Sequence, residues 1–183
     1  YTYDHFGSAS TYDDSFNYPS CIAVAASGNI YITDSGNNRI VKFDSSGTYV
    51  TSWGWGGPGT GDFAAGTGNG EFDNPTGIAV DSSENVYVCD SNNNRVQKFD
   101  SSGNFITSWG SLGTGDGQFD SPAGISIDGS GNVYVADWNN NRVQKFSASG
   151  SFIAKWGTSG TGNGQFSNPS DIAFDAAGNI YVV

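Results

Sequence analysis

Carboxylate and guanidinium side chains recur in this chain at one fixed spacing. Three turn-forming segments rich in asparagine each begin with an Asp and place an Arg five positions later, namely Asp34–Arg39, Asp90–Arg95 and Asp137–Arg142. Such an Asp can cap a turn by accepting hydrogen bonds from backbone N–H groups, and the Arg can then neutralise it. Equivalent copies cannot bring different groups to one point, as a catalytic site requires. We therefore interpret these six residues as a structural repeat motif.

Calcium binding is the alternative interpretation of the same turns. Hard cations prefer carboxylate and amide oxygens, but the acid spacing of a known calcium loop is absent from this sequence. The sequence also contains a single histidine, His5, and two cysteines, which are too few for a zinc cluster. We therefore expect no metal and no cofactor, with calcium as the weaker alternative.

The two cysteines each replace a small residue of the repeat. Cys21 stands where the other copies carry Gly77 and Gly124. Cys89 stands where the other copies carry Thr33 and Ala136. Both positions lie near the same end of neighbouring repeats, so a disulfide can form if the two Cα atoms approach within about 7 Å. Two buried free thiols are the alternative.

Two tryptophans are the candidates for contact with a ligand or a partner. Trp138 occupies a position of the polar turn at which the other copies have Ser35 and Ser91. Trp55 lies in the long Gly- and Thr-rich connection that follows Trp53. A tryptophan in a turn or long loop of a rigid scaffold can contact a sugar or a protein. The alternatives are packing of Trp138 on a neighbouring repeat and a flexible insertion around Trp55.

Other arrangements that support catalysis or nucleic-acid binding are missing from the sequence. Glutamate occurs only at Glu71 and Glu84, and no Ser-His-Asp arrangement is indicated. A paired-carboxylate mechanism would depend on aspartates that mostly form turns. The net charge is −11, and six of the seven Lys and Arg residues belong to the repeated segments. This leaves no basic face for nucleic acid or for an anionic membrane.

Composition favours an extracellular or cell-surface location. Lysine is scarce, whereas Gly, Ser, Thr, Asn and Asp are abundant, and the whole chain is acidic. The sequence has no apolar run long enough for a transmembrane helix, so we expect no membrane insertion.

The motif must be positioned by a repeated element of 47 residues. Pro75, Pro122 and Pro169 lie 47 positions apart, and Pro19 precedes Pro75 by 56 because the first copy carries nine extra residues. A period in the forties with several short β-rich runs is typical of a propeller blade. In the third copy these runs cover residues 124–128, 133–137, 142–146 and 151–156. Short turns between them predict a four-stranded antiparallel sheet.

We therefore predict an all-β propeller with three complete four-stranded antiparallel blades and a partial blade at each end. Residues 1–16 form the last strand of a preceding blade with its connection, and residues 17–71 form a blade with a long loop insertion. The next blades follow at residues 72–118 and 119–165, and residues 166–183 supply the first two strands of an incomplete blade.

The recurring blocks resemble the NHL-repeat family of β-propellers. The matching blocks are Pro-x-Gly-Ile-Ala-Val-Asp, Gly-Asn-x-Tyr-Val-x-Asp, Asn-Arg-Val-Gln-Lys-Phe and Phe-Ile-x-x-Trp-Gly, and they extend over essentially the whole chain. The resemblance implies a ring of about six blades, or about 280 residues. We therefore expect completion by further chain or by a neighbouring subunit. Some enzymes of this fold, the peptide-amidating lyases, hold zinc through several histidines, which His5 alone cannot reproduce.

The sequence thus favours a non-enzymatic extracellular propeller that acts as a structural, self-assembling or protein-interaction scaffold. Its expected partners are proteins, including copies of itself or the rest of a longer chain. A domain that senses a glycan or a peptide through Trp138 and Trp55 is the alternative. A metal-dependent enzyme of the lyase or lactonase kind is the weaker alternative, because these residues lack the metal ligands.

Overall fold

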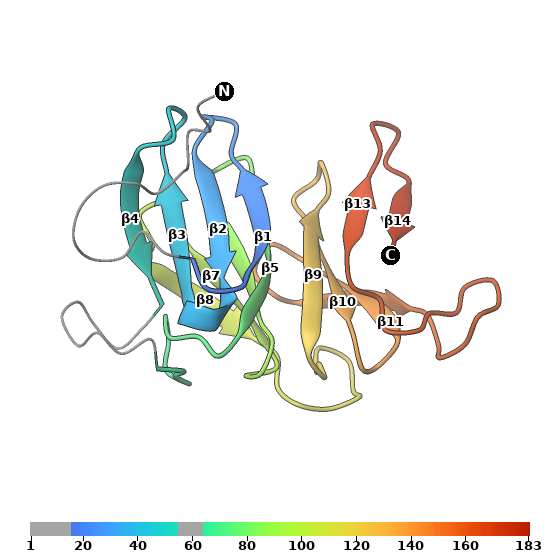
Figure 1. Cartoon of the computed structure of the whole chain (residues 1–183). Helices are drawn as coiled ribbons and strands as arrows, with labels where there is room; N and C mark the ends of the chain where they lie inside the picture. Colours follow the sequence, from blue (N-terminus) through green and yellow to red (C-terminus); the bar gives the residue numbers. More distant parts are fainter. Residues whose placement is uncertain (1–15, 55–63) are drawn as a thin grey trace, which may run out of the picture.

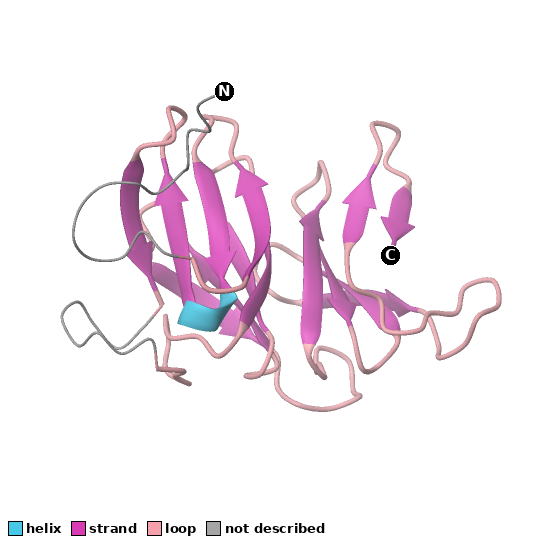
Figure 2. Cartoon of the chain, viewed as in Figure 1, coloured by secondary structure: helices cyan, strands magenta, loops and turns pink. Residues whose placement is uncertain are grey.

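The computed structural model describes residues 16–54 and 64–183. Within these residues the chain forms a series of antiparallel β-sheets that follow one another from the N-terminal blade to the C-terminal hairpin (Figures 1 and 2). The strand expected within residues 1–6 lies outside the described residues, as do His5 and Trp55.

Each blade is a meander in which consecutive strands are neighbours. The first blade contains β1 (Pro19–Val24), β2 (Ile30–Asp34), β3 (Arg39–Phe43) and β4 (Tyr49–Trp53). The second contains β5 (Pro75–Val80), β6 (Val86–Asp90), β7 (Arg95–Phe99) and β8 (Phe105–Trp109). The third contains β9 (Pro122–Ile127), β10 (Val133–Asp137), β11 (Arg142–Phe146) and β12 (Phe152–Trp156). A two-stranded sheet of β13 (Ile172–Phe174) and β14 (Ile180–Val182) follows.

The prediction of an all-β propeller with four-stranded antiparallel blades is confirmed, including the two-stranded partial blade after the third. The described helical structure is one three-residue 3-10 turn, η1 (Ser35–Asn37), between β2 and β3. No helix in residues 16–54 and 64–183 has the length and apolar character needed to span a membrane.

The repeated motif sets the turn between the second and third strands. In every blade the motif Asp ends the second strand and pairs in register with the Arg that begins the third, as Asp137 does with Arg142. The residue just before each Arg is an asparagine in the left-handed region, with φ of 49°, 54° and 53° at Asn38, Asn94 and Asn141. Asparagine adopts this conformation more readily than most residues, which explains its place in the motif.

A second aspartate shapes the hairpin between the first and second strands. In the third blade Asp128 Oδ1 accepts hydrogen bonds from the backbone N–H groups of Ser130 and Asn132. Its Oδ2 atom accepts hydrogen bonds from the Asn132 side chain at 2.8 Å and from the Tyr134 hydroxyl at 3.0 Å. One carboxylate therefore holds the tight turn and also orients a tyrosine of the next strand.

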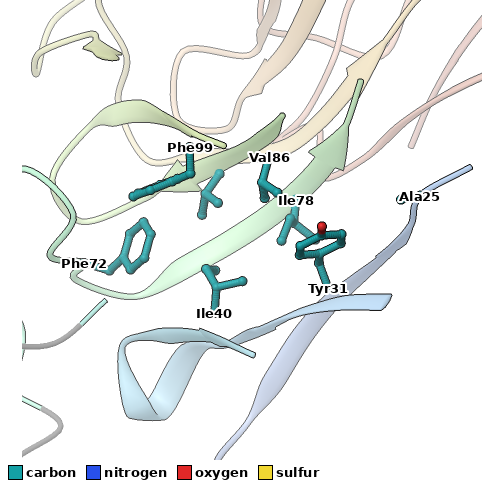
Figure 3. Close-up of a cluster of buried hydrophobic side chains, with 8 residues drawn as sticks. Ala25, Tyr31, Ile40, Phe72, Ile78, Val86 and Phe99 are labelled. Atoms are coloured by element: carbon teal, nitrogen blue, oxygen red, sulfur yellow. The ribbon is translucent and has the colours of Figure 1, made fainter. Parts of the chain in front are cut away.

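The hydrophobic core lies between the sheets, because each blade buries apolar side chains against the next one. In the first cluster, Tyr31 and Ile40 from the first blade meet Ile78 and Phe99 from the second, and Phe72 fills the space beside them (Figure 3). Equivalent clusters join the second blade to the third and the third to the β13–β14 sheet. Stability is therefore shared among successive interfaces, as in other repeat proteins.

Candidate functional site

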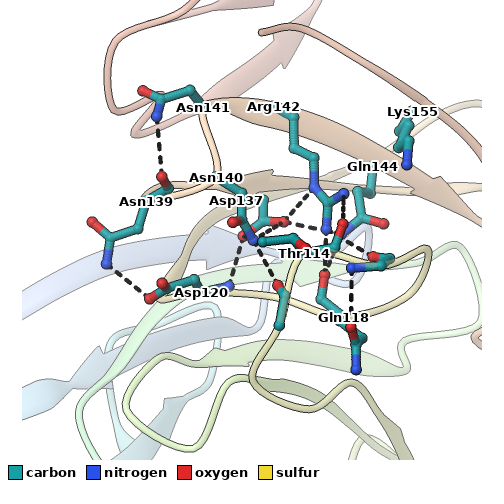
Figure 4. A network of polar contacts seen from close by, with 12 residues as sticks. Thr114, Gln118, Asp120, Asp137, Asn139, Asn140, Asn141, Arg142, Gln144 and Lys155 are labelled. Atoms are coloured by element: carbon teal, nitrogen blue, oxygen red, sulfur yellow. Dashed lines mark hydrogen bonds and ion pairs between the residues drawn. The ribbon is translucent and has the colours of Figure 1, made fainter. Parts of the chain in front are cut away.

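The motif of the third blade forms a buried network around the Asp137 carboxylate (Figure 4). Oδ2 of Asp137 accepts hydrogen bonds from Arg142 Nε at 2.7 Å and from Gln144 Nε2 at 3.1 Å. Oδ1 accepts the backbone N–H of Asp120 at 2.8 Å, and Asn140 donates to both oxygens at 3.0 Å. These donors compensate for the burial of the carboxylate.

The rest of the Arg142 side chain fastens the connection between blades. Its Nη1 atom donates to the carbonyl oxygen of Thr114 at 2.7 Å. Its Nη2 atom donates to the carbonyl oxygens of Gly115 and Gln118 at 2.9 and 2.7 Å. Arg95 contacts the preceding connection in the same way, through three carbonyl oxygens. The motif thus couples a strand turn to a loop more than 20 residues away.

The last asparagine of each motif reaches the following blade. Oδ1 of Asn38 accepts the backbone N–H of Asn74, and Oδ1 of Asn94 accepts that of Ser121, both at 2.8 Å. Asn141 makes the same contact with the N–H of Asn168 at 2.8 Å. The motif therefore holds together a turn, a loop and two blades.

In these contacts the charged groups of the motif serve to hold the fold together. The three Asp–Arg pairs each have an Nε–Oδ2 distance of 2.7 Å, and the carboxylates are buried, for Asp34–Arg39, Asp90–Arg95 and Asp137–Arg142. Across the described ranges, no group of three or more His, Cys, Asp or Glu side chains is placed to hold a metal ion. The arrangement can fix backbone geometry, and it exposes no free nucleophile or base.

Trp138 lies at the surface of the turn between β10 and β11, and 37% of it is exposed. The equivalent Ser91 is buried and donates a hydrogen bond to the Pro122 carbonyl oxygen of the next blade at 2.5 Å. Ser35 makes the same kind of bond to the Pro75 carbonyl oxygen. Trp138 has no hydroxyl for this contact, and its side chain stays partly exposed in the turn.

We call this end of the blades the turn end. It comprises the second-to-third-strand turns at residues 34–39, 90–95 and 137–142, together with the connections between blades. In an antiparallel meander both sets of loops lie at the same end of the sheet. The opposite end, which we call the hairpin end, carries the turns at residues 24–30, 80–86 and 127–133.

Two further exposed apolar residues belong to the turn end, and sequence reasoning missed them. Leu112 follows β8, is 66% exposed and stands where the next connection has Ser159. Tyr18 precedes β1, is 84% exposed and stands where the following blades have Asn74, Ser121 and Asn168. Alignment of the repeats would have found both, because each breaks a polar position. Asn140 joins this region by donating to the Gly113 carbonyl oxygen at 2.8 Å.

The lysines of the motif strands are held at the hairpin end. Lys98 Nζ lies 4.8 Å from the centre of the Tyr87 ring and 4.0 Å from Asp81 Oδ2. Lys145 repeats this arrangement with Tyr134 and Asp128, at 4.9 and 3.5 Å. At the turn end, Lys155 forms an exposed ion pair with Asp116 at 2.5 Å.

The cysteines are free thiols in the structure, and the disulfide considered from the sequence is not formed. Cys89 is fully buried, its Sγ atom lies 3.8 Å from the Gly124 carbonyl oxygen, and burial raises the pKa of its thiol well above the ordinary value. A buried, protonated thiol is a poor nucleophile. Cys21 is half-buried at the first blade interface.

Comparison with known proteins agrees with this architecture. The family model described as NHL repeat matches residues 16–43, 72–99 and 119–146. The protein lin-41 of Caenorhabditis elegans is 55% identical over 42 residues, which cover 23% of this chain and 4% of that protein. Human NHL repeat-containing protein 3 is 32% identical over 98 residues, which cover 51% of this chain and 26% of that protein.

Solved structures show the same fold. A streptogramin B lyase structure superposes with a TM-score of 0.66 at 19% sequence identity, and the match covers 90% of this chain and 47% of that chain. This chain therefore spans less than half of the lyase, and its matches cover 4% and 26% of the two sequence relatives. Three family matches on three consecutive four-stranded blades lead to one conclusion: the chain belongs to the NHL-repeat family of β-propellers.

Proposed function

We propose that this chain is a non-enzymatic scaffold that binds partner proteins at its turn end. The NHL-repeat fold supports protein interaction in general. The observation that carries the finer assignment is the grouping of Tyr18, Leu112 and Trp138 at one end, each in place of a polar residue of the repeat. Large exposed side chains on a rigid scaffold are the usual anchors of protein interfaces.

The contacts of the motif support a role without catalysis. Its carboxylates and guanidinium groups are bound to one another and to loop carbonyls, so they are already used for structure. The proposed scaffold needs no metal or cofactor. Likeness to a lyase at 19% identity concerns the fold, and it leaves a propeller enzyme as a competing function for a longer protein.

We further propose that the protein acts outside the cell and that its first blade associates with another blade. Ile22 and Val24 are 60% and 65% exposed on the first sheet, whereas the equivalent Ile78 is buried against the preceding blade. An apolar sheet face of this kind favours packing with a further blade of the same chain or of a second subunit. The acidic, lysine-poor composition supports the extracellular assignment.

Hydrogen–deuterium exchange on a complex with a captured partner protein tests the main proposal. Binding should slow amide exchange in the turns at residues 90–95 and 137–142 and in the connection at residues 110–121. Exchange in the hairpin turns at residues 80–86 and 127–133 should stay unchanged. Protection confined to the hairpin turns or to the outer strands would overturn the proposal.

A further inference from the structure

We infer that Trp138 and Asp120 together recognise a Lys or Arg side chain of a partner protein. The inference rests on the proposed function, because it assigns the chemistry of one contact at the turn end. A cation placed over the indole ring gains from the electron density of the ring, and a carboxylate beside it supplies the counter-ion.

Asn139 connects the two residues. It follows Trp138 in the turn, and its backbone N–H donates to the Asp120 carbonyl oxygen at 3.1 Å. Its side-chain amide donates to Asp120 Oδ1 at 2.9 Å and to the Ser121 hydroxyl at 3.3 Å. These bonds hold the Asp120 carboxylate beside the turn that presents Trp138 (Figure 4). The second oxygen, Oδ2, has no hydrogen bond to any part of the chain that the structure describes.

The second blade supplies a natural comparison. Asn92 donates to Asp73 Oδ1 at 2.9 Å, which reproduces the Asn139–Asp120 pair. The preceding residue there is Ser91, whose hydroxyl is buried against the next blade. The second blade thus has the carboxylate without an aromatic ring.

The distribution of positive charge leaves Asp120 without a cation among residues 16–54 and 64–183. Arg142 is bound to Asp137 and to loop carbonyls, and Lys155 is paired with Asp116. Lys145 lies at the hairpin end with Asp128. A partner cation would therefore meet a carboxylate that has no counter-ion among the described residues, bound to the turn in which Trp138 is exposed and at the same end as the exposed Leu112.

This combination favours a cationic side chain over a neutral sugar. A sugar can stack on Trp138, but its hydroxyl groups gain no net charge neutralisation from Asp120. A guanidinium group can stack on the indole and donate to the carboxylate at the same time. Loss of either residue should therefore weaken binding of the same cation.

The test uses an array of immobilised peptides of about a dozen residues. Matched peptides carry Arg, Lys, citrulline or Gln at the centre, so that charge changes with little change of shape. The intact chain should prefer Arg and Lys peptides. Trp138→Ser and Asp120→Asn should each weaken that binding by about fivefold to thirtyfold. Asp73→Asn, in the matched pair without an aromatic ring, should leave it unchanged. Thermal melts of all variants confirm that they fold.

Three outcomes overturn the inference: equal binding of citrulline and Arg peptides, equal effects of Asp120→Asn and Asp73→Asn, or binding of a neutral glycan panel that depends on Trp138 and ignores Asp120. If a protein partner still protects the turn end from hydrogen exchange, only this inference fails. If that protection is also missing, the proposed function fails with it.

Discussion

Tyr18 lies in the left-handed region of backbone conformation, with a φ of 50°. The equivalent residues of the next two blades, Asn74 and Ser121, have φ of 53° and 56°. The conformation is therefore a property of the repeat, and only the first blade places an exposed aromatic residue in it. A tyrosine that is strained and exposed is better explained by contact with a partner than by stability.

Replacement of Tyr18 should show the free-energy cost of its left-handed backbone conformation directly. We expect Tyr18→Asn to raise the free energy of unfolding by about 1 kcal/mol, because asparagine tolerates the left-handed region. Urea denaturation provides the measurement. The reverse change in the second blade, Asn74→Tyr, should lower the free energy of unfolding by a similar amount. Destabilisation by Tyr18→Asn would show that the tyrosine ring contributes to the fold.

The hydrogen bonding of one buried tyrosine hydroxyl differs between the first and second blades. Tyr87 donates to Asp81 Oδ2 at 3.0 Å, but the first blade has Ala25 in place of that aspartate. The Tyr31 hydroxyl is consequently buried with no hydrogen-bond partner among the described residues. Burial, followed by the charges of Glu84 and Asp100, raises the pKa of Tyr31 to about 12.

The two tyrosines should therefore respond differently to loss of the hydroxyl. We expect Tyr87→Phe to lower the free energy of unfolding by about 1–2 kcal/mol, because it breaks a hydrogen bond to a carboxylate. Tyr31→Phe should be neutral or stabilising, since it removes a buried polar atom that has no partner. Chemical denaturation of both variants gives the comparison, and equal losses would contradict it.

At the scale of elements, the 47-residue period predicted the four-stranded blade because every strand is bounded by a turn with its own Asp, Asn or Gly. The pairing of Asp137 with Arg142 was also predictable, because both belong to one short turn. The contacts of Arg142 with Thr114 and Gln118 were not predictable from the sequence. They depend on how a connecting loop folds back over the blade, and local residue patterns do not determine that path.

This network predicts unequal effects for two cations of the third blade. Arg142→Met should lower the free energy of unfolding by about 3–5 kcal/mol, because it leaves the buried Asp137 carboxylate without its partner. Lys155→Met breaks an exposed ion pair and should cost no more than about 1 kcal/mol. Urea denaturation measures both changes. A loss below about 1 kcal/mol for Arg142→Met would show that the pair contributes little to the fold.

At the scale of the whole molecule, acidic turns make stability dependent on pH. Burial opposes ionisation of Asp128, but hydrogen bonds from Asn132, Tyr134 and Ser130 lower its pKa to about 2. The pKa of Asp81 is also lowered, again against the effect of burial, by hydrogen bonds from Asn85 and Tyr87. Hydrogen bonds from Asn104 lower the pKa of Asp100 in another turn.

A carboxyl group whose pKa is lower in the folded state stabilises the fold above its unfolded pKa, which is about 3.9. This stabilisation is lost as the pH falls through the folded value of about 2. We therefore expect the melting temperature to fall steadily from about pH 4 to about pH 2. Asp128→Asn should make that fall shallower, and an unchanged slope would exclude Asp128 as a contributor.

The candidate site was only partly predictable. Trp138 was found from the sequence because it replaces a serine in an otherwise repeated turn. Tyr18 and Leu112 were missed, although each also replaces a polar residue of the repeat, and the structure adds their exposure and their common place at the turn end. The free carboxylate oxygen of Asp120 required the hydrogen bonds of Asn139 to be known. The unusual residue types could be identified in the sequence. Their common place at the turn end could not, because it depends on how successive blades pack.

The most direct test of partner binding at the turn end replaces its three exposed apolar residues with the polar residues found at the equivalent positions of other repeats. Calorimetry would compare a captured partner's affinity for the intact chain and for the variant Tyr18→Asn, Leu112→Ser, Trp138→Ser. A control variant carries Val50→Thr, Ile106→Thr and Ile153→Thr on exposed positions of the outer strands. We predict that the first variant weakens binding by at least about tenfold and that the control changes it by less than about twofold. Unchanged affinity of the first variant, with loss in the control, would contradict the account.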